Sequence, residues 1–292
     1  YYEISRPTGD KWIARYTADR ADGLKERSRA PHVHPNAVPE KLCTRIIETK
    51  LAHPNWGPKK VMDHLRDCQP RQPWPVDSTA GEILKRSGLV VPRRRKHRVP
   101  PDSQPFRDCA APNHTWSADF KGDFRLGNAE RCYPLTVSDN FSRYLLQCRA
   151  LRRPSHGAVS PWMEWTFREY GLPDAIRTDN GAPFASVAAG GLSLLSKWWI
   201  RLGIKPERIR PGRPDQNGRH ERMHRTLKAA GVAPIRANLA AQQRQFNAFV
   251  AEYNWERSHE ALGRKTPGSV YRASTRPYPA RLPAVEYDLD VI

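Results

Sequence analysis

Three acidic residues occur in contexts that suit catalysis with metal ions. Asp119 lies inside the alternating run "HTWSADFKGDF", Asp179 ends a short apolar run just before Asn-Gly, and Glu221 follows Gln-Asn-Gly at the start of an amphipathic run. These patterns predict one carboxylate inside a strand, one at the end of a strand and one in the first turn of a helix. Carboxylates so placed can converge on a divalent cation. Two such ions about 4 Å apart can clamp the attacking and leaving oxygens of a phosphoryl transfer.

Each carboxylate taken alone also has an ordinary structural explanation. An Asp before Asn-Gly is typical of a turn, and a Glu at a helix start interacts favourably with the helix dipole. The ordered set with its flanking residues is more specific. In the segments "SADF", "DNFSRYLL", "YGLPDAIRTDNGAPFAS", "PGRPDQNGRHERMHRTLK" and "YNWERSHEALGRKTPGSVY" the chain resembles the DDE transposases and integrases of bacterial insertion sequences. The resemblance covers most of the chain.

This resemblance implies a ribonuclease H-like core in which Asp119, Asp179 and Glu221 are both the catalytic residues and the metal ligands. It further implies two Mg²⁺ or Mn²⁺ ions, DNA as substrate and partner, a homo-oligomer assembled on DNA, and a bacterial cytoplasmic protein associated with the nucleoid. One feature departs from the family pattern. The 41 residues between Asp179 and Glu221 are more than is usual, and the excess is expected around Gly190 and Gly191.

Composition independently indicates a polyanionic partner. Lys and Arg number 49 against 30 Asp and Glu, which gives a net charge of +19 and a pI near 10.1. The excess is divided almost equally between the residues before and after Ala110, so both parts are expected to meet nucleic acid. A ribosome-like binder or a merely basic surface would share this composition. Membrane association is disfavoured, because no apolar run approaches the roughly 20 residues of a spanning helix.

The ends and the cysteines of the chain set further expectations. The sequence begins at Tyr1 rather than Met and shows no signal peptide, so we expect a piece of a longer protein.

The five cysteines of the chain are odd in number and include no Cys-x-x-Cys pair, which disfavours a disulfide framework or a structural zinc site. Retroviral integrases carry a His-His-Cys-Cys zinc domain that this chain lacks. His32 and His34, which lie beside prolines, are therefore expected in a linker.

The N-terminal part is expected to hold DNA-binding helices. Residues 1–30 resemble the remnant of a first helix-turn-helix, and residues 39–91 predict three short helices of a second one. Asp77 or Ser78 is expected to cap the third helix, and Lys85 and Arg86 to face phosphates. An ordinary three-helix bundle would give a similar pattern. Residues 92–112 predict a basic linker, in which Arg93, Arg94 and Arg95 track the DNA backbone.

Residues 113–273 predict an integrase-like catalytic core of α/β class, a mixed sheet flanked by helices. Strands are expected near 115–124, 131–138, 142–150 and 205–209, with a tight turn at Asp139 and Asn140. Helices are expected near 158–170 and 192–202, and a long helix from Leu239. In the helix at 158–170, Trp162, Trp165 and Phe167 are expected to face the core. Residues 274–292 form a Pro-rich and then acidic tail.

The expected Glu221 helix also carries basic residues. Arg225 and Lys228 follow Glu221 by four and seven positions and would share its face. A structural interpretation makes Glu221 and Arg225 an ion pair. A functional interpretation puts the carboxylate on metal and both bases on DNA, with Asn217 and His220 as further DNA contacts beside the site.

These patterns together favour a DNA transposase. We expect metal-dependent cleavage at the transposon ends, followed by strand transfer that integrates the element into target DNA. A noncatalytic helix-turn-helix regulator derived from a transposase is the main alternative, and a ribonuclease H-like nuclease without strand transfer is another. The target sequence, the pathway and the number of subunits are not determined by these patterns.

Overall fold

The structure is a computed structural model that describes residues 4–26, 37–90, 109–186, 192–209 and 218–282. It divides into two compact units, residues 1–42 and residues 43–292. In the first unit, helix α1 (Arg6–Gly23) has a proline in its first turn and changes direction at Arg20, whose φ of 52° interrupts the helix. Its apolar residues Ile13 and Tyr16 are exposed.

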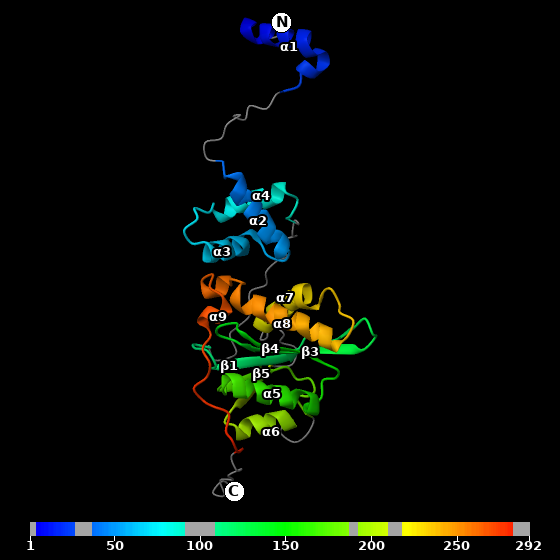
Figure 1. Ribbon diagram of the computed structural model, residues 1–292, viewed down its shortest axis with the longest axis vertical. Helices are drawn as coiled ribbons and strands as arrows, with labels where there is room; N and C mark the ends of the chain where they lie inside the picture. The colour runs from blue at the N-terminus through cyan, green and yellow to red at the C-terminus, as the bar shows by residue number, and fades with distance from the viewer. Residues whose placement is uncertain (1–3, 27–36, 91–108, 187–191, 210–217, 283–292) are drawn as a thin grey trace. The chain divides into compact units, whose positions relative to one another are not determined.

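Three short helices follow, as the sequence predicts: α2 (Glu40–Ala52), α3 (Pro58–Cys68) and α4 (Asp77–Arg86) (Figure 1). They share a small apolar core formed by Ile46, Trp56, Val61, Met62, Leu65, Ala80 and Leu84. The predicted cap of α4 is wrong. The helix is preceded by Val76 with no side-chain cap, and Asp77 instead accepts a hydrogen bond of 2.9 Å from Arg66 of α3. Its carboxylate is thus used to join two helices.

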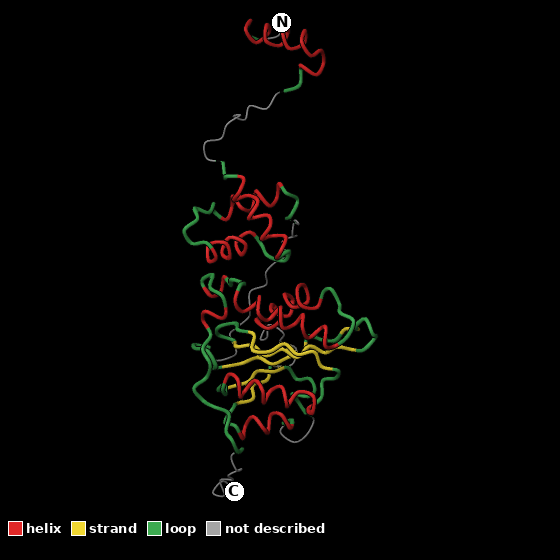
Figure 2. Tube along the Cα trace, viewed as in Figure 1, coloured by secondary structure: helices red, strands yellow, loops and turns green. Residues whose placement is uncertain are grey.

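A six-stranded mixed sheet forms the centre of the larger part of the second unit, shown in yellow in Figure 2. Its strands are β1 (Thr115–Phe120), β2 (Phe124–Arg125), β3 (Arg131–Asp139), β4 (Leu145–Leu151), β5 (Ala175–Thr178) and β6 (Lys205–Arg208). The order is β2-β3-β1-β5-β6, with β4 also on β3. Strand β1 is antiparallel to β3 and parallel to β5, so it lies in the middle of the sheet.

Helices cover both faces of this sheet, which confirms the predicted α/β class. Helices α5 (His156–Tyr170) and α6 (Leu194–Arg201) lie on one face. On the other lie α7 (Gly218–Leu227), the π-helical turn η3 (Lys228–Val232) and α8 (Leu239–Trp255) (Figure 1). Two short elements follow, η4 (Glu260–Leu262) and α9 (Pro267–Val270).

The alternation predicted for β1 is confirmed. Trp116 and Ala118 are buried in the apolar cluster of α5 and α6, and Phe120 packs against it. Ser117 and Asp119 therefore point to the opposite face, because successive side chains of a strand alternate. That face is built from Met223 and Leu227 of α7 together with α8 residues such as Phe246, Phe249 and Tyr253. Asp119 thus lies on the side of the sheet that α7 covers.

Three further predictions can be compared with the structure. The turn after β3 forms as expected: Asp139 accepts hydrogen bonds of 2.7 and 2.6 Å from the backbone and hydroxyl of Ser142. All five cysteines are free. Trp165 does not belong to the core, since it is 40 % exposed on the outer side of α5, whereas Trp162 and Phe167 pack inward. None of the described helices is long and apolar enough to cross a membrane.

Candidate active site

The sheet brings Asp119 and Asp179 to neighbouring strands. In the parallel pair β1 and β5, Thr115 lies beside Ala175 and Ser117 beside Arg177. Asp119 lies two residues beyond the last of these pairs in β1, and Asp179 directly follows Thr178, the last residue of β5. Neighbouring strands are about 4.8 Å apart. The two carboxylates therefore arise from adjacent backbones at the same edge of the site.

Backbone amides fix both aspartates. The carboxylate oxygen Oδ1 of Asp119 accepts a hydrogen bond of 2.7 Å from the amide of Phe120. Oδ1 of Asp179 accepts one of 3.1 Å from the amide of Gly181, within the turn that the Asn-Gly sequence predicts. Asn180 ties this turn to β6 through a bond of 2.8 Å to the carbonyl of Ile209. Each carboxylate is thus oriented by its own segment before any ion binds.

Glu221 is exposed in the first turn of α7, which is the element predicted for it. The helix is held against the sheet from its other side, where His220, Met223, His224 and Leu227 are buried. Among the described residues, no ion pair joins Glu221 to Arg225 or Lys228. The structural interpretation of Glu221 as half of a helix ion pair therefore has no support in this geometry.

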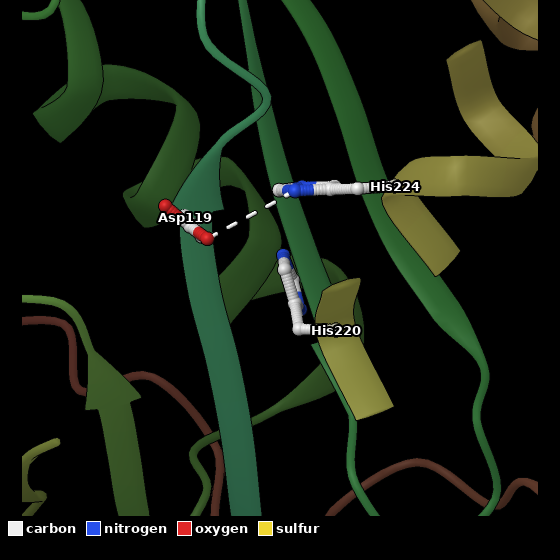
Figure 3. Close-up of side chains that lie close together, drawn as sticks. All are labelled: Asp119, His220 and His224. Carbon is white, nitrogen blue, oxygen red and sulfur yellow. Dashed lines mark ion pairs between the residues drawn. The ribbon is translucent and has the colours of Figure 1, made fainter. Parts of the chain in front are cut away.

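A cluster of potential ligands forms where α7 faces β1 and β3 (Figure 3). Asp119, His220 and His224 offer ligand atoms that all lie within 4.8 Å of one another, and the part of the chain that the structure describes holds no other such set of three. Oδ2 of Asp119 is 3.9 Å from Nδ1 of His224, which is too long for a hydrogen bond. Asp179 and Glu221 lie outside this cluster.

Two hydroxyls of β3 contact the histidines. Thr136 Oγ1 is 2.8 Å from Nε2 of His220 and 2.7 Å from Nε2 of His224, and Ser138 Oγ is 3.0 Å from Nδ1 of His220. Burial lowers the pKa of His220 to about 3. Burial, and then the neighbouring His220 and Lys121, lower the pKa of His224 to about 2. Both rings are therefore neutral at pH 7 in the ion-free protein.

Comparison with known proteins places this site in a family. Residues 110–214 and 202–267 each match the integrase core domain family, and residues 8–84 match the homeodomain-like domain family. A protein of insertion element IS476 from Xanthomonas euvesicatoria is 30% identical over 257 residues, which cover 87% of this chain and 71% of the relative. The chain belongs to the DDE-type transposases of insertion sequences.

Other relatives of this transposase include bacterial and viral proteins. A protein of insertion element IS407 from Burkholderia multivorans is 30% identical over 194 residues, which cover 63% of this chain and 65% of the relative. The Gag-Pol polyprotein of baboon endogenous virus is 31% identical over 117 residues, which cover 40% of this chain and 6% of the polyprotein. The transposase thus spans about two thirds of the length of its insertion-element relatives.

Solved structures of two viral integrases are similar to the transposase. The intasome of simian T-cell lymphotropic virus, in complex with the PP2A regulatory subunit B56 gamma, has a TM-score of 0.48 at 17% identity and covers 84% of this chain and 80% of its own. The HTLV-2 integrase catalytic core domain in complex with magnesium has a TM-score of 0.43 at 16% identity. The match covers 56% of this chain and 99% of the HTLV-2 chain.

The DNA-binding residues predicted from the transposase sequence fall into three groups. Lys85 and Arg86 are exposed at the end of α4, and Arg225 and Lys228 are exposed on α7 and at the start of η3. His220 does not fit its predicted DNA contact, because its ring is 1% exposed and both its nitrogens are hydrogen-bonded inside the protein. Asn217, Arg93, Arg94 and Arg95 lie outside the described residues, as does the segment at Gly190 and Gly191.

Sequence reasoning missed His224, Thr136 and Ser138 as parts of this site. The signal for the histidines was present, since "HERMH" has the H-E-x-x-H spacing that places two histidines on one face of a helix. In metalloproteases such a pair binds zinc and the intervening Glu acts as a base. Here the Nε2 atoms of His220 and His224 both contact Thr136, so that hydroxyl occupies the position where the zinc would lie.

Proposed function

We propose that the transposase cleaves DNA at the ends of its element and joins the new 3′-hydroxyls to target DNA. The observation that supports the proposal is the parallel pairing of β1 with β5, because Asp119 lies in β1, Asp179 directly follows β5, and α7 carries Glu221 in its first turn. Three carboxylates from a middle strand, an adjacent strand end and a facing helix are the arrangement expected for metal-dependent phosphoryl transfer.

The donor set fits hard divalent cations. Asp119, Asp179 and Glu221 supply only carboxylate oxygens, the ligands that Mg²⁺ and Mn²⁺ take in phosphoryl-transfer sites. Two such ions, when bound, would activate the attacking hydroxyl or water and stabilise the leaving oxygen. The contribution of the protein is placement. The amides of Phe120 and Gly181 hold the two aspartates, and α7 carries Glu221 on a helix anchored by Met223 and Leu227.

The substrate requires basic surfaces on two elements. Arg225 and Lys228 are exposed on the same stretch as Glu221, where they can hold phosphates beside the metals. Lys85 and Arg86 end α4, the helix that would enter the major groove if residues 39–91 form the second helix-turn-helix. Because two element ends must be joined together, the active form is a homo-oligomer on DNA, and it acts on the bacterial nucleoid.

A strand-transfer assay tests this function directly. The purified full chain is incubated with Mg²⁺ or Mn²⁺, duplexes carrying the ends of its element and a target plasmid. Asp119→Asn, Asp179→Asn and Glu221→Gln should each lower cleavage and joining by at least about 100-fold, since one preorganised charge-stabilising group commonly supplies that much. DNA binding should persist, because it depends on phosphate contacts elsewhere.

A control variant changes a carboxylate outside the three proposed site residues. Asp123→Asn removes an exposed carboxylate that pairs with Arg131 at 2.7 Å, and it should leave joining unchanged. Full activity in any of the three site variants would remove that residue from the site. Specific end binding by the wild type without cleavage would favour the noncatalytic regulator. Hydrolysis without joining would favour a nuclease.

A further inference from the structure

The hydroxyl of Thr136 determines where the protons of two histidines lie. It donates to the backbone carbonyl of Asp119 at 3.0 Å, and a carbonyl oxygen can only accept. A hydroxyl has one proton, so its oxygen must accept from Nε2 of His220 and from Nε2 of His224, at 2.8 and 2.7 Å. Only this assignment satisfies all three contacts at once. Both imidazoles therefore carry a proton on Nε2.

His220 uses its second nitrogen inside the protein. With its proton on Nε2, the neutral ring presents a lone pair at Nδ1, and Ser138 Oγ lies 3.0 Å away to donate to it. The ring is 1% exposed. His220 therefore has no nitrogen left for an ion, although it belongs to the cluster of potential ligands.

His224 directs its second ring nitrogen toward the candidate metal site. Since Nε2 donates to Thr136, Nδ1 is the nitrogen that remains for an ion, and it lies 3.9 Å from Oδ2 of Asp119 (Figure 3). At this distance the two atoms form no hydrogen bond with each other. An ion bound at the usual 2.0–2.2 Å from an imidazole nitrogen and a carboxylate oxygen can bridge atoms up to about 4.2 Å apart. The observed separation falls within that reach.

We propose that Nδ1 of His224 is a further ligand of the ion held by Asp119, which gives this ion a mixed nitrogen and oxygen donor set. The inference rests on the proposed metal at Asp119. Imidazole suits transition metal ions such as Zn²⁺, Fe²⁺ and Ni²⁺, and Mn²⁺, although it is the weakest binder of that series, accepts a nitrogen ligand more readily than Mg²⁺ does. The Asp119 position should therefore prefer Mn²⁺ to Mg²⁺. Thr136, His220 and Ser138 are positioning residues, because their hydrogen bonds fix the tautomer and the orientation of His224.

Pulsed electron paramagnetic resonance of Mn²⁺ bound to the full chain tests the proposal. The wild type should show a hyperfine coupling from a nitrogen bound to the ion, and incorporation of ¹⁵N-histidine should convert it to the ¹⁵N pattern. His224→Gln should abolish the coupling, since glutamine can still donate to Thr136 but offers no nitrogen lone pair. It should also lower the preference for Mn²⁺ over Mg²⁺ by at least about ten-fold.

The control variant is His259→Gln, which changes a largely buried histidine outside the cluster and should leave the coupling intact. Mn²⁺ that binds without nitrogen coupling in the wild type would overturn the proposal, because Nδ1 of His224 would then not be a ligand of the ion. The labelling needs no mutation, so a variant that fails to fold does not weaken the test. Absence of Mn²⁺ binding would overturn it as well.

Failure here is distinguishable from failure of the proposed function. If DNA joining occurs and nitrogen coupling is absent, the transposase function is confirmed and His224 is not a metal ligand. If the coupling is present but no DNA is joined at any concentration of Mn²⁺ or Mg²⁺, His224 is confirmed as a metal ligand and the proposed function is wrong.

Discussion

Arg225 and Lys228 are exposed cations that follow Glu221 by four and seven positions. Among the described residues, neither forms an ion pair with an acidic side chain. An exposed cation without a partner contributes little to stability, whereas its charge remains available to a polyanion. Their surroundings therefore favour DNA contact over a structural role.

Replacing both residues by alanine separates these roles. Arg225→Ala/Lys228→Ala should leave the melting temperature unchanged and the Mn²⁺ affinity nearly so, because neither side chain is packed or bound to the site. It should lower DNA joining, and the slope of log affinity against log salt should fall by about two, one for each lost phosphate contact. Thermal unfolding, joining and salt-dependent binding are measured on one preparation.

The matched control is Arg152→Ala/Arg153→Ala, which removes two exposed charges just after β4. This variant has the same net charge as the first. An equal fall in salt slope for both variants would show a general electrostatic effect and would remove Arg225 and Lys228 from the proposed DNA contact.

At the scale of elements, the stretch after Glu221 is a helix in two parts. The sequence predicts one helix as far as Lys228, but α7 ends at Leu227 and the π-helical turn η3 continues to Val232. Gly231 explains the close approach of this turn to α8. A Cβ at Gly231 would lie 2.5 Å from Cδ1 of Leu227 and 3.1 Å from Cγ of Phe249.

Gly231→Ala should therefore destabilise the protein. Alanine normally stabilises a helix by up to about 1 kcal/mol relative to glycine, while overpacking a core costs about 1–3 kcal/mol. Steric cost should prevail, because Leu227 is fully buried and Phe249 is nearly so, and neither side chain can move aside. We expect a net loss of about 1 kcal/mol in the free energy of unfolding, measured in urea.

Gly157→Ala is the matched control, since Gly157 lies near the start of α5 with nothing within 4 Å of a new Cβ. This substitution should be neutral, or stabilising by up to about 1 kcal/mol. Equal stability of the Gly231 and Gly157 variants would mean that the turn at Gly231 yields, and that the contact with α8 does not depend on glycine.

The same elements show which features are readable from sequence. Alternation in β1 follows from residue type, so the faces of Trp116 and Asp119 could be predicted. The pairing of β1 with β5 joins segments that are far apart in the sequence. Local patterns could not predict it, and only the resemblance to a known family indicated it. The predicted cap of α4 does not form, because Asp77 pairs with Arg66. This tertiary contact competes with the local hydrogen bond that a helix cap would make. The tautomer of His224 depends on Thr136 in another strand, so the motif alone could not give it.

At the scale of the whole molecule, three largely buried histidines couple stability to pH. Burial lowers the pKa of His220 to about 3. Burial, and then cations such as Lys60 and Arg257, lower the pKa of His259 to about 3. Burial, and then His220 and Lys121, lower the pKa of His224 to about 2. In the unfolded chain a histidine has a pKa near 6.5. Between these values the unfolded chain binds more protons than the folded one, so the free energy of unfolding falls as pH falls.

The metal-free chain should therefore lose stability between pH 7 and pH 5.5, before the carboxylates titrate. Each of the three histidines should contribute a loss of roughly 1 kcal/mol over this interval, because a full pKa unit corresponds to about 1.4 kcal/mol. Urea unfolding at several pH values, with EDTA present, measures this slope. His259→Gln should reduce it by about a third, while substitution of the exposed His114 by Gln should leave it unchanged. A wild-type free energy of unfolding that stays constant over the interval would mean that the folded chain takes up as many protons as the unfolded chain, and the lowered pKa values of the three histidines would then be wrong.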